Sequence, residues 1–254
     1  MPHVETSAGE LFYTVNQGLG DGPELVLVHG AGGSRLHWPA ELRCMSEATV
    51  RTLDLPGHGR SRGEGCKTVG GYAEAVIAFL DGTQVDQAVI AGHSMGGAIA
   101  QTLALQHPDR VAALVLIATG ARLRVAPAIL DGIQGDFEGT VNLITQHAWS
   151  SNADPSMKEL GRAALRNAGP DVLLGDFLAC DQFDVMDRLA EISVPTLVIS
   201  STADVLTPLK YGRFLADQLP RAQLVTVEGA GHMVMLEQAE EVADAIREFL
   251  SSYC

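Results

Sequence analysis

The sequence predicts an α/β fold of the doubly wound type, in which a mostly parallel sheet lies between two layers of helices. Several short apolar runs are continuous rather than alternating, which is typical of strands buried on both faces. Helical segments separate these runs along the chain, as in a doubly wound sheet. With 254 residues, 46% of them hydrophobic and 19% charged, the chain has the composition of a globular protein with a full core.

The expected strands and helices alternate through most of the chain. The apolar runs that predict buried strands are residues 25–28, 88–91, 113–117 and 196–199, and a further apolar stretch, residues 224–227, predicts another strand. Helices are predicted over residues 69–80 and 94–107, and Pro108 ends the second because proline cannot continue a helix. Near the C-terminus, apolar residues recur at steps of three and four, which places them on one face of a further helix: Ala239, Val242, Ile246, Phe249 and Leu250.

One long segment interrupts this alternation. Between the predicted strands 113–117 and 196–199, the chain has no convincing buried strand but several fragments rich in Leu, Ile and Ala, broken by Gly and Pro. A structureless loop of this length is uncommon in a compact domain. We therefore expect a core formed by residues 1–120 and 191–254, and a helical cap, or lid, formed by residues 121–190.

The charge and the cysteines limit the classes of partner. The chain has 17 Lys and Arg against 31 Asp and Glu, a net charge of −14, which argues against nucleic acid and anionic membrane as partners. No apolar run approaches the roughly 18 residues of a membrane span, and the N-terminus lacks the pattern of a secretory signal. The cysteines, Cys44, Cys66, Cys180 and Cys254, are scattered without metal-binding spacing, so we expect reduced thiols and a cytoplasmic location.

The segment Gly92-His93-Ser94-Met95-Gly96 matches the motif G-x-S-x-G. It follows a predicted strand and opens a predicted helix, which is the setting of a nucleophile elbow that exposes the serine oxygen. We expect a strained backbone at Ser94, with glycine neighbours that allow the strand and the helix to approach closely. Ser94 is therefore the predicted nucleophile.

A second glycine-rich loop, His29 to Ser34, follows the first buried strand. In the elbow architecture, one oxyanion-hole N–H comes from the residue after the nucleophile, here Met95, and the other from this earlier loop. We assign the second donor to Ala31. The alternative, a dinucleotide-binding loop, is disfavoured because Arg35 stands where that motif needs a small residue.

A base and an orienting acid follow the serine in the chain order expected for this elbow. Asp204 lies just after the strand 196–199, and His232 follows the run 224–227. Ligands of open α/β sheets bind at the carboxyl ends of the strands, where both residues should lie. Ser94, His232 and Asp204 are thus the predicted catalytic triad.

These motifs together resemble those of helical-capped serine esterases and lactonases of the α/β-hydrolase superfamily. Other matching segments are His29-Gly30 with Trp38 downstream, residues 53–61, residues 195–199 running on to Pro208, and Gly231-His232 followed by Glu237. The similarity covers nearly the whole chain and is weakest in the cap. It implies an α/β-hydrolase fold and a carboxylic ester hydrolase activity.

Departures from neighbouring subfamilies narrow the expected reaction. Haloalkane dehalogenases and epoxide hydrolases use an Asp nucleophile in place of Ser94, and the menaquinone-pathway lyase typically has Arg where this chain has Ala98. The C–C bond hydrolases usually have Gly-Pro-Gly where this chain has residues 32–34, Gly-Gly-Ser. We expect hydrolysis of an ester or lactone through an acyl-enzyme; a cofactor-free perhydrolase or haloperoxidase, a C–C bond hydrolase and a noncatalytic binding protein remain alternatives.

Large apolar side chains of the cap and near the site are candidate pocket residues: Trp38, Phe137, Trp149, Phe177 and Met233. They predict a small uncharged ester or lactone as the substrate. Neither a metal nor an organic cofactor is required by a Ser-His-Asp mechanism. The sequence leaves the oligomeric state open.

Overall fold

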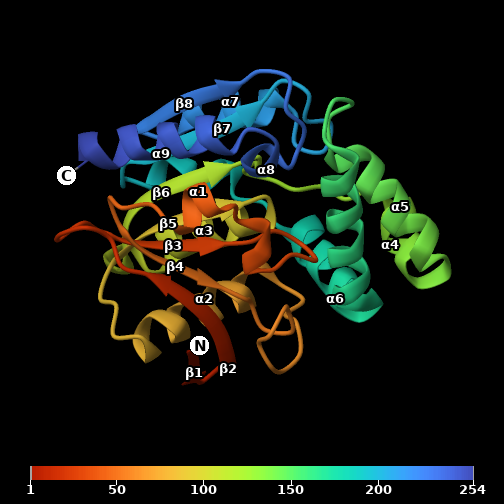
Figure 1. Ribbon diagram of the computed structural model, residues 1–254, viewed down its shortest axis with the longest axis horizontal. Coiled ribbons are helices and arrows are strands. Elements are labelled where there is room, and N and C mark those ends of the chain that lie inside the picture. The colour runs from red at the N-terminus through yellow and green to blue at the C-terminus, as the bar shows by residue number, and fades with distance from the viewer. Residues whose placement is uncertain (1, 254) are drawn as a thin grey trace.

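The computed structural model describes residues 2–253, and within them eight strands form one sheet in the order β1-β2-β4-β3-β5-β6-β7-β8 (Figure 1). The strands are β1 His3–Thr6, β2 Gly9–Asn16, β3 Glu24–Val28, β4 Thr49–Leu53, β5 Ala88–His93, β6 Val111–Ile117, β7 Thr196–Ser201 and β8 Ala222–Val227. Strands β3 to β8 run parallel to one another, whereas β1 and β2 form an antiparallel edge next to β4. The predicted fold class is confirmed.

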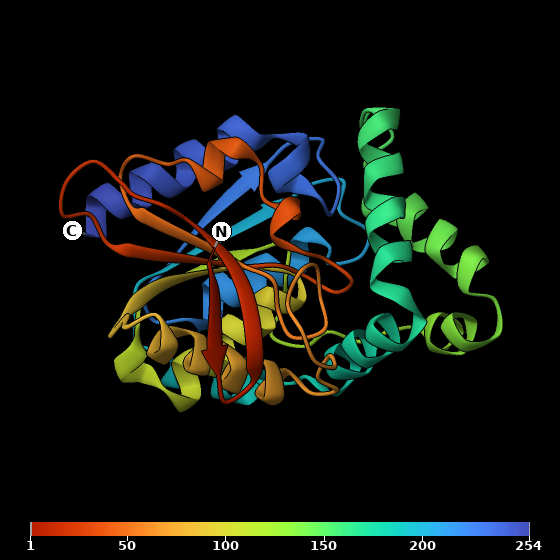
Figure 2. The same ribbon diagram turned by 60° about the horizontal axis from the view of Figure 1, so that its bottom comes forward.

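Helices cover both faces of the sheet. They are α1 Ala40–Arg43, α2 Val69–Gly82, α3 Met95–Gln106, α4 Pro127–Gly135, α5 Phe137–Ala148, α6 Pro155–Gln182, α7 Leu209–Gln218, α8 Val234–Glu237 and α9 Ala239–Tyr253, with short 3-10 turns at Arg35–His37, Pro108–Arg110 and Met186–Glu191. Buried residues of α2, α3 and α7 pack in one core cluster, and those of α1 and α9 pack in a second cluster on the opposite face. Figure 2 shows these two layers with the sheet between them. None of the helices within residues 2–253 is long and apolar enough to cross a membrane.

The predicted core elements lie where the sequence placed them, with ends that shift by one or two residues. The apolar runs 88–91 and 196–199 extend to His93 and Ser201 as fully buried strands. The sequence did not predict β1 and β2. Their residues are mostly half-buried, and the apolar stretch of β2, Leu11 to Tyr13, is short, because this hairpin lies at the edge of the sheet.

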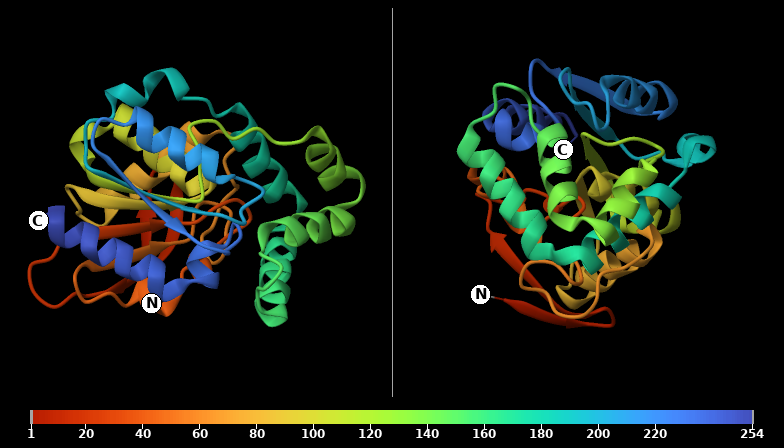
Figure 3. Two further views of the ribbon diagram at one scale, coloured as in Figure 1. Left: turned by 90° about the horizontal axis from the view of Figure 1, so that it is seen from above. Right: turned by 90° about the vertical axis from the view of Figure 1, so that its right-hand side faces the viewer.

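The segment between β6 and β7 folds into α4, α5 and α6. Together they bury a small apolar cluster of their own, centred on Ile133, Val141 and Leu173. Helix α6 is bent at Gly169, whose φ is 79°, and Pro170 follows immediately. These helices lie beyond one end of the sheet, as the left view of Figure 3 shows. That end is the one at which the loops after β3, β5, β7 and β8 converge on a common cavity.

Candidate active site

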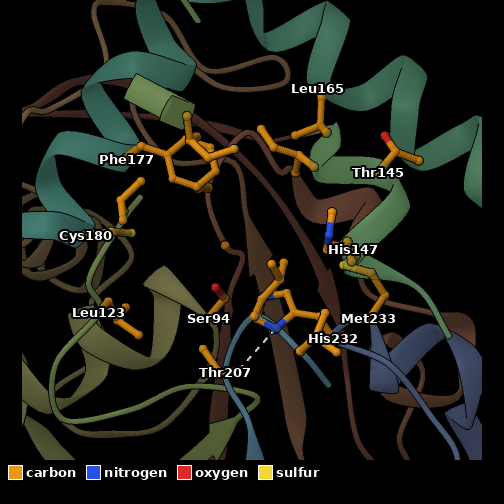
Figure 4. Close-up of a pocket in the computed structure, with 18 of the residues that line it drawn as sticks. Ser94, Leu123, Thr145, His147, Leu165, Phe177, Cys180, Thr207, His232 and Met233 are labelled. Atoms are coloured by element: carbon orange, nitrogen blue, oxygen red, sulfur yellow. Dashed lines mark hydrogen bonds between the residues drawn. The ribbon is translucent and has the colours of Figure 1, made fainter. Parts of the chain in front are cut away.

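Ser94 occupies a sharp turn between β5 and α3. Its φ of 54° and ψ of −116° form a strained combination for a residue with a side chain. The turn is possible because its neighbours are glycines: a Cβ atom on Gly96 would collide with the carbonyl oxygen of Val28 on the adjacent strand. Ser94 therefore stands at the end of the strand with its side chain directed into a cavity (Figure 4).

Asp204 and His232 meet across the loops that follow β7 and β8. The Oδ2 atom of Asp204 lies 2.9 Å from Nδ1 of His232, and both side chains are buried. The hydroxyl of Thr207 donates to the same carboxylate oxygen at 2.7 Å and lies 3.1 Å from Nδ1. Two backbone N–H groups, of Leu206 and Thr207, donate to the other oxygen at 2.8 and 2.9 Å. The carboxylate is thus held by four donors.

This arrangement fixes the tautomer of His232. An ionised carboxylate only accepts hydrogen bonds, so Nδ1 carries the ring hydrogen and Nε2 is left with a lone pair. The ring and Ser94 line the same cavity, and Figure 4 shows them next to one another. The geometry suits a base that accepts the proton of the serine hydroxyl.

The surroundings of Asp204 favour its charged form. Burial by itself raises the pKa of this carboxyl group, but the nearby His232 and the hydrogen bonds from His232 and Thr207 outweigh it, so the net pKa lies below its ordinary value. The carboxylate is therefore ionised throughout the neutral range.

His93, next to the serine, supports the histidine loop. Its Nε2 lies 3.0 Å from the carbonyl oxygen of His232 and donates to it. Burial and the neighbouring His232 lower the pKa of His93 well below its ordinary value. A neutral His93 thus anchors the backbone of His232 without adding charge to the site.

Of the two expected oxyanion donors, Met95 follows Ser94 directly and Ala31 lines the same cavity as Ser94. Met95 is the first residue of α3, where the N–H has no acceptor within the helix. Ala31 lines the cavity in the loop after β3, and its N–H has no hydrogen-bond partner within residues 2–253. Both groups are available to a negatively charged oxygen near the serine.

A buried acid that the sequence analysis missed holds the loop of Ala31. Asp176, on the cap helix α6, accepts the N–H of Gly32 at 2.7 Å and lies 2.8 Å from Nε2 of His58 on the same oxygen, while its other oxygen accepts the hydroxyl of Tyr72. Burial lowers the pKa of His58, but the hydrogen bond and the charge of Asp176, together with the carbonyl of Pro56 and the charge of Asp54, outweigh it, and the net shift is upward. Burial and Asp176 both raise the pKa of Tyr72.

The cavity above Ser94 has a volume of about 540 Å³. Of the five expected pocket residues, Trp149, Phe177 and Met233 line it. Trp38 and Phe137 do not, and this is a correction. Trp38 is fully buried in the core cluster beneath α1 and α9, and Phe137 packs within the cap.

Several lining residues were missed by the sequence analysis. They are mostly apolar and come from the cap and from the loop after β7: Leu123, Ile129, Leu143, Ile144, Leu165, Cys180, Val205 and Leu206, together with His37. Cys44, Cys66 and Cys180 are free thiols, whereas Cys254 lies outside the described residues. Burial raises the pKa of Cys180, so this thiol is protonated at neutral pH and offers a nonpolar surface.

Comparisons with known proteins agree with this geometry. A curated pimeloyl-[acyl-carrier protein] methyl ester esterase from Vibrio campbellii is 29% identical over 92% of this chain and 96% of its own length. A thermophilic esterase of known structure is 33% identical, with a TM-score of 0.88 over 99% of this chain and 97% of that chain. An enzyme described as degrading N-acyl homoserine lactones is 28% identical, with a TM-score of 0.87 over 98% of this chain and 100% of that chain.

The family comparison covers most of the fold described above. The model of the alpha/beta hydrolase family matches residues 25–245, from the first parallel strand to the last helix. The chain belongs to the alpha/beta hydrolase family, and it is a carboxylic ester hydrolase.

Proposed function

We propose that the protein hydrolyses a small carboxylic ester or lactone through an acyl-enzyme on Ser94, with His232 as the base and Asp204 as the orienting acid. The observation that supports this most directly is the buried hydrogen bond of 2.9 Å between Asp204 and His232. It leaves Nε2 of His232 free in the cavity that Ser94 also lines. A serine beside a neutral, oriented imidazole is an activated nucleophile.

In the first half of the reaction, Oγ of Ser94 attacks the ester carbonyl carbon while Nε2 of His232 takes the hydroxyl proton. The carbonyl oxygen becomes an oxyanion, which the N–H groups of Ala31 and Met95 stabilise; one such donor is often worth about 3 kcal/mol. The tetrahedral intermediate then breaks its bond to the leaving oxygen. His232 returns its proton to that oxygen, and the alcohol is released.

In the second half, water replaces the alcohol. His232 takes a proton from water, and the hydroxide attacks the acyl carbon on Ser94. The bond to Oγ breaks, His232 protonates Oγ, and the acid leaves. Asp204 stabilises the imidazolium in both halves and keeps its own charge.

The lining of the cavity supports an uncharged reacting part of the substrate. Aliphatic and aromatic side chains from the cap surround the space above Ser94, and apolar walls disfavour an unpaired charge. The names of the relatives, a methyl ester esterase, an esterase and a lactone-degrading enzyme, are consistent with this substrate class. We further propose that residues 121–190 form the lid whose side chains select among such substrates.

A panel of p-nitrophenyl esters of graded chain length, together with several lactones, tests this function. A fluorophosphonate probe should label the protein at Ser94 and should fail to label Ser94→Ala. Hydrolysis should be insensitive to EDTA, because the nucleophile is a side chain rather than metal-bound water. Absence of both hydrolysis and labelling in the folded protein would reject the proposal.

A further inference from the structure

A second cavity, of about 250 Å³, adjoins the catalytic cavity. It lies between the start of the cap and helix α7, and three basic side chains line it: Arg122, Arg124 and Lys210. Arg124 and Tyr211 line both cavities. A molecule bound in the catalytic cavity therefore lies next to residues that also line the second one.

The backbone places the two arginines on one side of the chain. After β6 the chain forms a single antiparallel bridge between Arg122 and Asp184. In such an extended segment, alternate side chains point to opposite sides. Leu123 is buried, whereas Arg122 and Arg124 are exposed. Both arginines thus lie on the same side of this segment, and both line the second cavity beyond the carboxyl end of β6.

Lys210 joins them from the other side of the cavity. It is the second residue of α7, which begins at Leu209. The first turn of a helix has unpaired N–H groups and a positive end of the helix dipole, which add to the charge of the lysine.

These positive charges are only weakly neutralised within the protein. Arg122 lies 3.7 Å from Asp184, and both side chains are more than two-fifths exposed, at 45% and 43%. Arg124 donates to the backbone carbonyl of Asp181 at 3.4 Å and has no ion pair within residues 2–253. Lys210 likewise has none among the described residues, and its ammonium lies 5.8 Å from the centre of the Tyr211 ring.

The three basic residues of the second cavity are opposite in sign to the net charge of the whole molecule. The chain has 17 basic and 31 acidic residues, yet the second cavity is lined by three basic residues and no acidic one. The two acids at the exit of α6 also bind backbone N–H groups: Asp181 accepts that of Val125 at 3.0 Å, and Asp184, besides its pair with Arg122, accepts that of Met186 at 3.2 Å.

We propose that this cavity is a subsite for an anionic group of the substrate, a carboxylate or a phosphate, remote from the ester that reacts at Ser94. Guanidinium groups bind both anions through paired N–H donors, and the ammonium of Lys210 adds a point charge. The substrate is then an ester with an uncharged reacting part and a negative end. This inference rests on the proposed function of Ser94, and it replaces a wholly uncharged substrate by an anionic one.

Matched pairs of substrates test the subsite. On the acyl side, the monomethyl esters of dicarboxylic acids of graded length are compared with the corresponding dimethyl esters. On the alcohol side, acetate esters of ω-hydroxy acids and of ω-hydroxyalkyl phosphates are compared with their methylated, neutral counterparts. In at least one series and at one length, kcat/KM for the anion should exceed that for the neutral ester by roughly 3- to 10-fold at low ionic strength, and salt should reduce this ratio.

Variants that each remove one positive charge test which residues cause the preference for anionic esters. In Arg124→Gln and Lys210→Gln the ratio of anionic to neutral kcat/KM should fall toward one. Arg221→Gln, an exposed charge just before β8 at the opposite end of the sheet, should leave the ratio unchanged. If all anionic esters react no faster than their neutral partners, or if Arg221→Gln lowers the ratio as much as Arg124→Gln does, the subsite is overturned. Failure of the proposed function is distinct, because neutral esters would then not be hydrolysed at all.

Discussion

The carboxylate of Asp176 lies 2.7 Å from the backbone nitrogen of Gly32, and this hydrogen bond joins the cap to the loop of Ala31. Gly32 has a φ of 62°, and a Cβ there would press against Leu165 and Leu173 of the same cap helix. The residue that follows the expected oxyanion donor is thus fixed by an acid 144 positions later in the chain. Asp176 does not line the catalytic cavity, so it acts on the reaction through a neighbour, and its bond to Gly32 makes the loop of Ala31 the direct route.

Asp176→Ala should lower kcat by roughly 10- to 100-fold with a smaller change in KM, because a displaced Ala31 N–H stabilises the oxyanion less well. Asp176→Asn should restore most of the activity, since its amide oxygen can accept the Gly32 N–H while its NH₂ group donates to the Tyr72 hydroxyl. Steady-state kinetics of the three proteins on one ester measure how the change divides between kcat and KM.

Tyr72→Phe is the matched control for stability. It removes the partner of the other carboxylate oxygen and should cost about 1 to 2 kcal/mol of unfolding free energy. It leaves the bond to Gly32 in place, so kcat should stay within about threefold of the starting protein. A purely structural role for Asp176 predicts the opposite: kcat would then track stability in both variants.

Ser94→Ala should lower turnover by roughly 10⁴- to 10⁶-fold, because the members of a triad act as a unit. The fold should change little, since removal of one hydroxyl leaves no large cavity. Ester hydrolysis and the thermal unfolding midpoint are measured on the same preparation. A variant that keeps a tenth of the starting activity would show that another residue is the nucleophile.

Asp204→Asn should lower kcat by about 10⁴-fold, because an amide can stabilise the wrong tautomer of His232. The matched controls are Asp181→Asn and Asp184→Asn, the acidic residues at the exit of the cap. Their carboxylates bind Val125 and Arg122, at 3.0 and 3.7 Å, rather than His232. Equal loss of activity in either control would move the orienting role away from Asp204.

The parts of this molecule that the sequence predicted are those with local patterns. Continuous apolar runs gave the buried strands, and the order of Ser94, Asp204 and His232 placed three residues at one edge of a parallel sheet. Asp176 could not be found in this way, because its partners Gly32, His58 and Tyr72 come from distant segments and meet only in the folded chain. Trp38 was misplaced for a related reason: nearness in sequence to the site does not tell whether a large side chain faces the cavity or the core.

Histidines whose pKa is lowered in the folded protein predict how stability depends on pH. His29 and His93 are buried, and His37 is half-buried. Burial is the largest cause that lowers the pKa of His29, His37 and His93, and for His37 the value falls to about 4. Each stays neutral in the folded protein while its unfolded counterpart takes up a proton below about pH 6.5. The contribution of these three histidines to the free energy of unfolding should therefore be fully present above that pH and fall as the pH drops. The limiting slope is about 4 kcal/mol per pH unit for three protons.

His58 acts in the opposite direction. Its pKa is raised in the folded protein, where Asp176 stabilises the charged ring, so its contribution is present below about pH 6.5 and is lost as the pH rises through the folded value. The free energy of unfolding should thus pass through a maximum slightly above pH 6.5. Urea denaturation between pH 4.5 and 9 measures this curve, over roughly the range in which histidines titrate.

His37→Gln tests how much one histidine contributes to the fall in stability below pH 6.5. In this variant the slope should decrease by about 1.4 kcal/mol per pH unit, whereas His147→Gln, at an exposed position of the cap, should leave the slope as it was. The Nε2 atom of His37 is buried without a hydrogen-bond partner, so its protonation would place an unpaired charge beside the catalytic cavity. If His37→Gln and the starting protein have the same slope from pH 6.5 down to 5, the fall in stability below pH 6.5 does not come from the neutral state of His37.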